Sequence, residues 1–473
     1  MLESLSLEAR VITAVESSRS ELAALVGDAR VVSDPMACAA FAVDGKVPTY
    51  VVYPPSAEQV AAVLRHCADR ALAVIPCRNG TKLGIGNPPA RYDVALSLKD
   101  LNQVWYYEPA DLTVSVEPGM KLADFQHFVG RHKLWLPLDP PGAERASLGG
   151  ILAANASGPL RVAYGGPRDM VIGMKIATTE GKIVKTGGRV VKNVAGYDMG
   201  KLLIGSYGTL GVIVEASFKL YPLPAASATF VFAVDTLHRA RELRRSIQRS
   251  HLQPMRLLLI DAEAARLLRK DPTGQPDQIG SAASLLPATR GGAEVWFEAA
   301  GSPRLLERNE RDARELARAV EAPIEGVDAS VAESAWSRLA GFHTWLAEDD
   351  PSLVVLKVTM PIAALEDFLG RARQEADRES LRLAIFAQPG VGIALLCLLE
   401  VKQGDALRGL IDRVRKLAAE IGGALVVERC STQLKSAIDV WGPVGDDFEM
   451  MRKVKLAWDP KGILSPGRFV SRI

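Results

Sequence analysis

The sequence has few cysteines, no long apolar run and almost no net charge, and each of these absences excludes a class of protein. Five cysteines in 473 residues, with no Cys-x-x-Cys among them, leave neither a disulfide framework nor a readable iron–sulfur or zinc site. No apolar run approaches the roughly 18 residues that span a bilayer. The formal net charge of +2 is too small to indicate nucleic acid as a partner.

The N-terminus does not have the pattern of a secretory leader. Glu3, Glu8 and Glu16 interrupt its apolar residues, where a signal peptide would have a basic segment, an apolar segment and a cleavage site. We therefore expect a cytoplasmic protein. The alternative is a protein that docks peripherally at the inner membrane through its partners. At 473 residues the chain has room for about three domains.

The two commonest nucleotide-binding signatures do not occur. Gly84-Ile85-Gly86 has no third glycine and no following helix, and the sequence contains no Gly-Lys-Ser/Thr. What it does contain is a run from Gly187 to Gly211 with seven glycines among Lys, Arg, Asn and Tyr. Glycine lets backbone approach a flat or anionic group closely, so this run indicates a cofactor site. A series of turns between strands is the alternative.

The order of elements predicts an α+β protein. A strand at 49–53, a helix at 57–70 and a strand at 73–76 form a βαβ unit, followed at once by a polar turn. Such a turn at the carboxyl end of a buried strand is where α/β folds bind phosphate. Residues 229–428 then spell βαββαβ twice, the order of a ferredoxin-like unit.

These motifs resemble the FAD-binding domain of the vanillyl-alcohol oxidase and p-cresol methylhydroxylase superfamily, over about residues 48–222 and 458–469. Within that superfamily, the run at 188–198, Gly-Arg-Val-Val-Lys-Asn-Val-Ala-Gly-Tyr-Asp, is similar to the E-type FAD-binding subunits of bacterial glycolate dehydrogenase (glycolate oxidase). The resemblance implies a two-subdomain FAD-binding domain under a cap of two ferredoxin-like units. The predicted divisions are an N-terminal helical segment (1–47), the FAD-binding domain (48–225), the cap (226–430) and a C-terminal segment that packs back (431–473).

The resemblance also implies the residues that bind the cofactor. The turn at 78–82 matches the loop that holds the FAD pyrophosphate, two segments between 142 and 158 match its neighbours, and residue 213 falls beside the adenine. Arg189, Lys192 and Tyr197 are candidates to face the flavin ring or the cap, with holding the two subdomains together as the alternative. The implied cofactor-binding residues are Arg78, Asn79, Gly80, Thr81, Lys82, Gly142, Ser147, Gly149, Gly150, Ala153, Asn155, Ala156, Ser157, Gly158 and Ile213.

Three departures from the family pattern bear on the flavin. Arg78 and Asn79 stand where glycines are common, and we expect Asn79 to support the turn because asparagine tolerates the left-handed conformation. Ser465 replaces the usual Asn of the terminal Leu-Asn-Pro-Gly-Lys motif. No histidine lies within 76–88, where some members bond covalently to the flavin, so we expect noncovalent FAD.

The cap lacks the family's metal ligands. The metal-dependent 2-hydroxy-acid dehydrogenases of the superfamily carry a His-x6-His pair and a Glu-His motif, whereas here Glu428-Arg429-Cys430 ends the last cap strand. We predict no metal, and no catalytic residue is assigned. His343 is either a lone base or a packing or surface histidine; Arg429 either holds a substrate carboxylate or pairs with Glu428 at the surface.

The leading functional hypothesis is an FAD-binding subunit of a glycolate or other 2-hydroxy-acid dehydrogenase complex. It would serve electron transfer or assembly beside a second flavoprotein and an iron–sulfur subunit. One alternative is a self-sufficient FAD-dependent oxidoreductase with a different substrate. Another is a structural subunit that has lost its flavin.

Overall fold

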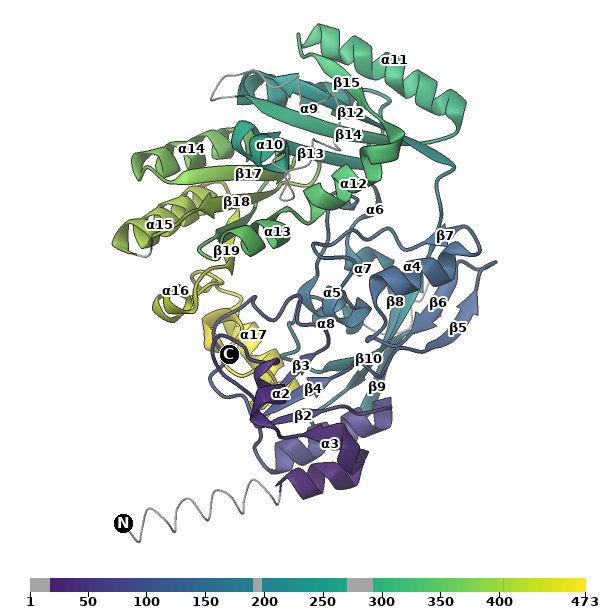
Figure 1. The fold of residues 1–473 in the computed structure, drawn as a ribbon, viewed down its shortest axis with the longest axis vertical. Helices are drawn as coiled ribbons and strands as arrows, with labels where there is room; N and C mark the ends of the chain where they lie inside the picture. Colours follow the sequence, from purple (N-terminus) through teal and green to yellow (C-terminus); the bar gives the residue numbers. More distant parts are fainter. Residues whose placement is uncertain (1–17, 190–197, 270–291, 403) are drawn as a thin grey trace.

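The computed structural model describes residues 18–189, 198–269, 292–402 and 404–473. Two halves lie one above the other in Figure 1. The lower half is built from the first part of the chain and the C-terminal tail, and it contains a four-stranded and a five-stranded sheet. The upper half is the cap, one eight-stranded sheet flanked by helices. No helix of the described residues is long and apolar enough to cross a membrane.

The first sheet of the lower half contains the predicted βαβ unit. Its order is β1-β2-β4-β3, and β2, β4 and β3 run parallel. Ser56 begins the crossover helix α3, because its side chain accepts a hydrogen bond from the backbone N–H of Gln59. The elements are β1 (Val31–Val32), α2 (Pro35–Ala39), β2 (Tyr50–Val52), α3 (Ala57–Asp69), β3 (Val74–Cys77) and β4 (Val94–Ser97). The polar loop that starts at residue 78 leaves the end of β3.

The second sheet is antiparallel, in the order β5-β6-β10-β8-β9, and a two-stranded pair, β7 with β11, lies beside it. The strands are β5 (Val104–Glu108), β6 (Thr113–Val116), β7 (Leu134–Trp135), β8 (Val171–Ala177), β9 (Ile183–Gly187), β10 (Val212–Lys219) and β11 (Tyr221–Pro222). The helices are α4 (Leu122–Gly130), α5 (Leu148–Ala154), α6 (Arg161–Tyr164), α7 (Pro167–Met170) and α8 (Gly200–Leu203). Helices α4 and α5 share an apolar core with this sheet.

The cap consists of two ferredoxin-like units, as predicted, and the structure joins them edge to edge. The sheet order β15-β12-β14-β13-β17-β18-β16-β19 is one four-stranded unit followed by a second, with β13 pairing antiparallel to β17. The first unit contains β12 (Ala226–Val234), α9 (Leu237–Arg249), β13 (Arg256–Asp261), α10 (Ala262–Arg269), β14 (Ala293–Gly301), α11 (Pro303–Ala319) and β15 (Ile324–Val327). The second contains β16 (Val354–Thr359), α14 (Leu365–Arg378), β17 (Arg382–Gln388), β18 (Ile393–Leu399), α15 (Asp405–Glu420) and β19 (Ala424–Arg429).

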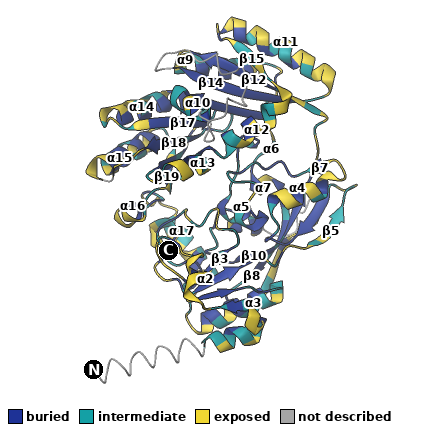
Figure 2. Ribbon diagram, viewed as in Figure 1, coloured by how far each residue is buried: buried dark blue, intermediate teal, exposed yellow. Residues whose placement is uncertain are grey.

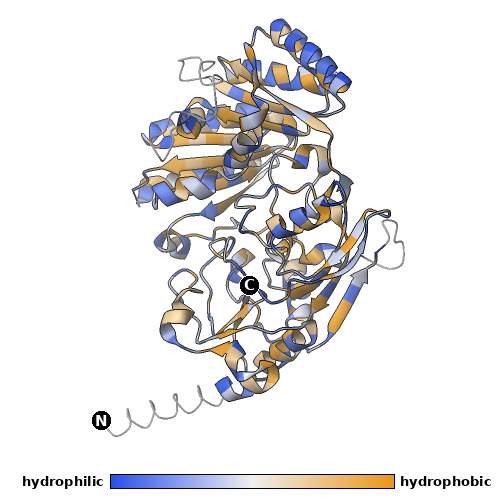
Figure 3. Ribbon diagram, turned by 45° about the vertical axis from the view of Figure 1, so that its right-hand side comes forward, coloured by the Kyte–Doolittle hydropathy of each residue, from blue (hydrophilic) through white to orange (hydrophobic). Residues whose placement is uncertain are grey.

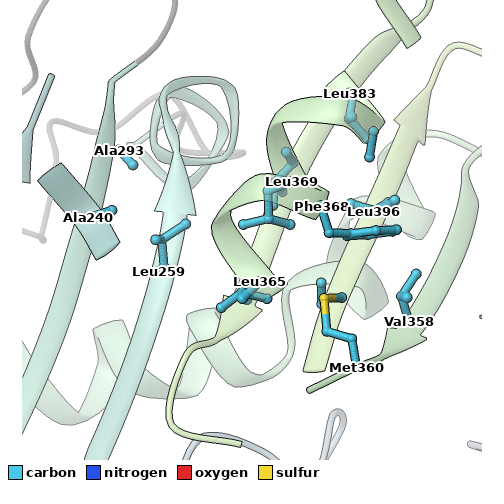
Figure 4. Close-up of a cluster of buried hydrophobic side chains, with 14 of the residues drawn as sticks. Ala240, Leu259, Ala293, Val358, Met360, Leu365, Phe368, Leu369, Leu383 and Leu396 are labelled. Carbon is cyan, nitrogen blue, oxygen red and sulfur yellow. The ribbon is translucent and has the colours of Figure 1, made fainter. Parts of the chain in front are cut away.

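Strand periodicity gives the cap sheet two different faces. On β16, Leu356 and Val358 join the core under α9, α11, α14 and α15, and Val355 points to the opposite face. Figure 4 shows side chains of α14 in this core, including Leu365 and Phe368. The sheet is buried and apolar, whereas the outer helices expose polar sides (Figures 2 and 3).

The opposite face is covered by α10 of the first unit and by two helices between the units, and for these two helices the sequence prediction was wrong. One helix was expected over 329–347, but the structure has α12 (Ala329–Ala340) and α13 (Phe342–Asp349), separated at Gly341. Glycine disfavours a helix interior, and Gly341 lies between the two helices with φ −92° and ψ 7°. The break leads α13 across the cap face that looks toward the lower half (Figure 1).

The tail returns to the lower half through α16 (Thr432–Ala437) and α17 (Phe448–Trp458). The buried Lys455 ammonium donates to Thr209 O at 2.8 Å and to the Asp459 carboxylate at 2.7 Å. Ser465 N donates to Val74 O at 2.8 Å, which places the terminal segment beside β3. The residue boundaries predicted between the four segments stay predictions.

A charged contact joins the halves. Asp139, in the loop after β7, lies 3.6 Å from Arg256 of cap strand β13 and accepts hydrogen bonds from Leu160 N. Burial raises the pKa of Asp139 to about 7, although Arg256 and the backbone donors act to lower it. The carboxyl is therefore partly protonated at neutral pH.

We expect a pH-dependent difference in stability between the wild type and Asp139→Asn. The folded pKa of Asp139 is raised, so its contribution to stability is complete below the unfolded value of 3.8 and is lost as the pH rises to about 7. Urea unfolding should show the wild type losing about 1 kcal/mol per pH unit relative to the variant within that window. A difference that stays constant from about pH 5 to about pH 7 would contradict the assignment.

Candidate functional site

A cavity lies in the lower half, enclosed by the loop after β3, the start of α5, the turn before β10 and the tail. These segments are far apart in sequence, and the fold brings them together around the cavity. The predicted cofactor residues that line it are Arg78, Asn79, Gly80, Thr81, Lys82, Ser147, Gly149, Gly150, Ala153 and Ile213. Their contact with FAD stays a prediction.

Five predicted residues do not line this cavity. Gly142 lines a second cavity, described below. Asn155 ends α5 in the left-handed conformation, at φ 48°. Ser157 accepts a hydrogen bond from Arg161 at 3.1 Å, and Ala156 lies between these two residues. A Cβ at Gly158 would stand 2.0 Å from Asp139 O, so Gly158 serves close backbone packing.

The glycines of the cavity divide into two kinds. A Cβ at Gly149 would stand 2.6 Å from Pro118 Cβ, so Gly149 packs a turn against α5. At Gly150 a Cβ would meet Ser147 Oγ at 3.2 Å and no backbone atom outside its own helix, so a side chain there would extend into the cavity. Gly208 has φ 70° and packs on Pro76. The cavity therefore contains backbone that a larger residue would cover.

The loop at 78–82 keeps its turn without the predicted help from Asn79. Its left-handed residue is Gly80, with φ 73°, and neither Arg78 nor Asn79 has a positive φ. Arg78 instead donates through Nε to Gly119 O at 3.0 Å, and Asn79 donates to Arg145 O at 2.5 Å. The two side chains tie the loop to its neighbours and leave the backbone turn intact.

One nitrogen of a cationic side chain in the cavity, Arg468 Nη1, has no hydrogen-bond acceptor among the described residues. Arg468 donates through Nη2 to Leu83 O at 2.6 Å and Ile85 O at 2.5 Å, while its buried Nη1 has no hydrogen-bond partner among the described residues. A buried donor without an acceptor calls for a ligand atom. A phosphate or carbonyl oxygen of FAD would satisfy it, so these residues fit the cofactor.

Charged side chains gather where the cap meets the cavity. Lys357 of β16 forms an ion pair with Glu428 of β19 at 2.9 Å. Lys82, from the cavity loop, donates to Pro141 O at 2.9 Å and is close enough for its charge to act on Glu428 and Lys357. Helix α13 adds His343 to the same group. We call these four residues the junction cluster.

Burial sets the protonation states of the junction cluster. It lowers the pKa of Lys82 to about 8 and that of His343 to about 4, so His343 is neutral at pH 7. Burial alone would raise the pKa of Glu428, but Lys357 and the other basic groups hold it below its ordinary value. Two lysines therefore face one carboxylate.

The sequence left the roles of His343 and Arg429 open, and the structure shows the surroundings of both side chains. His343 is half-buried, and its Nδ1 has no hydrogen-bond partner among the described residues. Arg429 is exposed, and Glu428 pairs with Lys357 rather than with its neighbour in sequence. Over the residues that the structure describes, no three His, Cys, Asp or Glu side chains come together as a metal site.

The glycine-rich run contributes its end to the cavity. Ser206, Tyr207, Gly208 and Gly211 line it, and burial raises the pKa of Tyr207, with Glu428 adding to the shift. Arg189 lies over the ring of Tyr106 on β5, 4.6 Å from the ring centre. Lys192 and Tyr197 lie outside the described residues.

Sequence reasoning missed Lys357, Tyr207 and Arg468. Lys357 did leave a signal, because a lysine within the apolar run Val-Val-Leu-Lys-Val is unusual in a buried strand. Tyr207 and Arg468 lie in two segments that the sequence did single out, the glycine-rich run and the terminal motif, but their side chains were not assigned to the cavity because their place there depends on contacts between distant segments.

Comparison with known proteins identifies the family. Residues 48–187 match the family model "FAD binding domain", and residues 223–469, more than half of the chain, match "FAD linked oxidases, C-terminal domain". Glycolate oxidase subunit GlcD of Bacillus subtilis is 25% identical over 433 residues, covering 90% of both chains. A D-lactate dehydrogenase of Archaeoglobus fulgidus is 27% identical over 435 residues, covering 89% of this chain and 91% of that one.

Solved structures agree on the fold. A p-cresol methylhydroxylase with substrate bound matches with a TM-score of 0.74 at 16% identity, covering 96% of both chains. Alkyldihydroxyacetonephosphate synthase matches with a TM-score of 0.73 at 18% identity, covering 95% of this chain and 84% of that one. With an FAD-binding domain, an oxidase cap and a cavity whose free donor fits the cofactor, the chain belongs to the FAD-linked oxidases and is an FAD-dependent oxidoreductase of the glycolate oxidase and D-lactate dehydrogenase family.

Proposed function

We propose that this chain oxidises a small 2-hydroxy acid, such as glycolate or D-lactate, at a noncovalently bound FAD. The observation that carries the proposal is the junction cluster, which places two lysines and a neutral histidine at the cap side of the cavity. The printed names of the relatives, a glycolate oxidase subunit and D-lactate dehydrogenases, support the same substrate class.

The two lysines of the junction cluster can bind the carboxylate of a substrate. Lys357 and Lys82 carry two positive charges at neutral pH and Glu428 one negative charge, so the cluster has one cation in excess. An incoming carboxylate would balance it through charge-assisted hydrogen bonds to the ammonium groups. The bound carboxylate would then lie at the junction cluster, next to the flavin cavity that Lys82 lines.

His343 is placed to act as the base that takes the hydroxyl proton of the substrate. When a hydroxyl carbon is oxidised to a carbonyl, its hydrogen leaves with two electrons and the hydroxyl proton must go to a base. FAD, when bound, accepts the two electrons. His343 is neutral at pH 7 and has an unpartnered Nδ1, so it can take the proton from the hydroxyl oxygen. A carboxylate bound beside it would raise its pKa and make it a better base.

We further propose that the reduced flavin passes its electrons to partner subunits, a second flavoprotein and an iron–sulfur protein. Support comes from the similarity to a protein named as a subunit of glycolate oxidase. The test is affinity purification of the tagged chain from its own cells, followed by flavin and iron assays. A complex with more flavin than tagged chain, together with iron, is expected. A chain that purifies alone with equimolar flavin and no iron would favour the self-sufficient enzyme.

A further inference from the structure

A second cavity, of about 600 Å³, opens between the two halves of the molecule. Its lower wall is α4, β7 and the loop at 138–145, and its upper wall is α12 and α13 of the cap. It shares no lining residue with the flavin cavity. Its volume is within the range of about 300–1,000 Å³ that is usual for small-molecule sites.

Three indole rings line the second cavity. Trp336 and Trp345 have their N–H groups bonded, to Thr229 Oγ1 at 3.0 Å and Arg338 O at 3.1 Å. Trp135 has a buried Nε1 with no hydrogen-bond partner among the described residues. Tryptophan faces bind planar apolar groups, and the free N–H of Trp135 can donate to an acceptor.

The polar groups of this cavity have an excess of donors. Arg256 is buried and bonds through its terminal nitrogens to Glu298 at 3.1 Å and Glu333 at 3.0 Å. The Nε of Arg338 is buried and has no hydrogen-bond acceptor among the described residues, whereas the Nε of Arg256 lies 3.6 Å from the Asp139 carboxylate. Arg338 and Arg145 also form no ion pair within the described part of the chain. Donors without acceptors favour a ligand that is rich in oxygen and negatively charged.

Acidic side chains do not cancel this preference. Glu333 is already paired with Arg256. Glu144 and Glu348 also line the cavity, but both are exposed, so water screens their charges, and Glu144 accepts a hydrogen bond from Ser337. Asp139 has its pKa raised by burial to about 7 and carries less than a full charge at neutral pH. Arg145 and Arg338 therefore remain available to an anion.

We propose that the second cavity binds an aromatic carboxylate, with its ring beside the indoles of Trp135 and Trp345 and its carboxylate on Arg145, Arg338 and the indole N–H of Trp135. Such a ligand contacts the FAD-binding half and the cap at once. It therefore stabilises their contact, and the melting temperature rises with ligand concentration. This site is separate from the proposed 2-hydroxy-acid site, and either can fail without the other.

The test is calorimetric titration of the flavin-loaded chain with 2-naphthoate and, as the uncharged match, 2-naphthalenemethanol. We expect the acid to bind at least about 10-fold more tightly than the alcohol, because hydrogen bonds to a carboxylate are stronger than those to a neutral hydroxyl. Arg338→Gln and Arg145→Gln should each weaken the acid by about the same factor. Arg245→Gln, on the exposed face of α9, makes the same charge change away from the cavity and should leave the affinity unchanged.

Three results would overturn the proposal. No heat from 2-naphthoate with the wild type would show that the cavity takes no such anion. Equal affinity for acid and alcohol would show an apolar pocket without anion recognition. A shift of the flavin absorbance on adding the acid, with affinity retained in both arginine variants, would place binding at the flavin instead. If Arg338→Gln does not fold, Arg145→Gln still tests the proposal. Arg145 is exposed, so its replacement should leave the fold intact.

Discussion

Gly150→Trp is expected to yield a folded protein without flavin. Gly150 lines the cavity near the start of α5, and the position of its Cβ meets only the hydroxyl of Ser147, at 3.2 Å. An indole can therefore extend from this residue without displacing backbone, and it fills space that FAD needs. The measurement is the flavin absorbance of the purified protein together with its circular dichroism.

Two matched variants make the result specific. Gly326→Trp, on the exposed edge strand β15, places the same side chain where no atom lies within 4 Å of the new Cβ, and it should keep full flavin content. Gly149→Ala forces a Cβ against Pro118 and should lower stability instead. Stoichiometric flavin in a folded Gly150→Trp protein would show that the cavity is not the cofactor site.

Lys82→Met is expected to slow flavin reduction by a 2-hydroxy acid by about 100-fold, the size typical of losing one charge-stabilising donor. Lys82 bonds only a backbone carbonyl, Pro141 O, and forms no ion pair within 4 Å among the described residues, so its removal leaves no carboxylate unpaired. The measurement is stopped-flow bleaching of the flavin. Lys453→Met, on the exposed surface of α17, is the control and should react as the wild type.

The same residue predicts a pH profile. The pKa of Lys82 is lowered to about 8, so its ammonium is present below that pH and is lost above it. If the ammonium holds the substrate carboxylate, kcat/KM falls as the pH rises through about 8. Lys82→Arg stays charged and should extend the active range upward. A rate that instead rises through this pH would show that Lys82 acts as a neutral base.

The order of elements in the cap was predictable because it is local. Each strand and helix carries its own hydrophobic period, and βαββαβ read twice along the chain leads to two ferredoxin-like units. The pairing of β13 with β17 that joins them has no such signal, since it brings together residues more than 120 positions apart. The break at Gly341 was missed because the apolar period continues through α12 and α13.

Parts of the candidate site could be predicted where close approach of the backbone requires glycine. Gly80 and Gly150 mark close approach to the cavity, whereas Gly158 looked equivalent and instead packs on Asp139. The junction cluster could not be predicted. Lys82 and Glu428 lie far apart in sequence and meet only because the cap sheet is placed over the loop after β3.

The most direct test of the proposed reaction is anaerobic mixing of the purified chain, without partners, with glycolate or D-lactate while the flavin absorbance is followed. We expect a yellow protein whose flavin band bleaches on adding one of these acids and returns when oxidant is admitted. A yellow protein that no 2-hydroxy acid bleaches, although dithionite does, would contradict the claim that this chain carries the reaction at its own flavin.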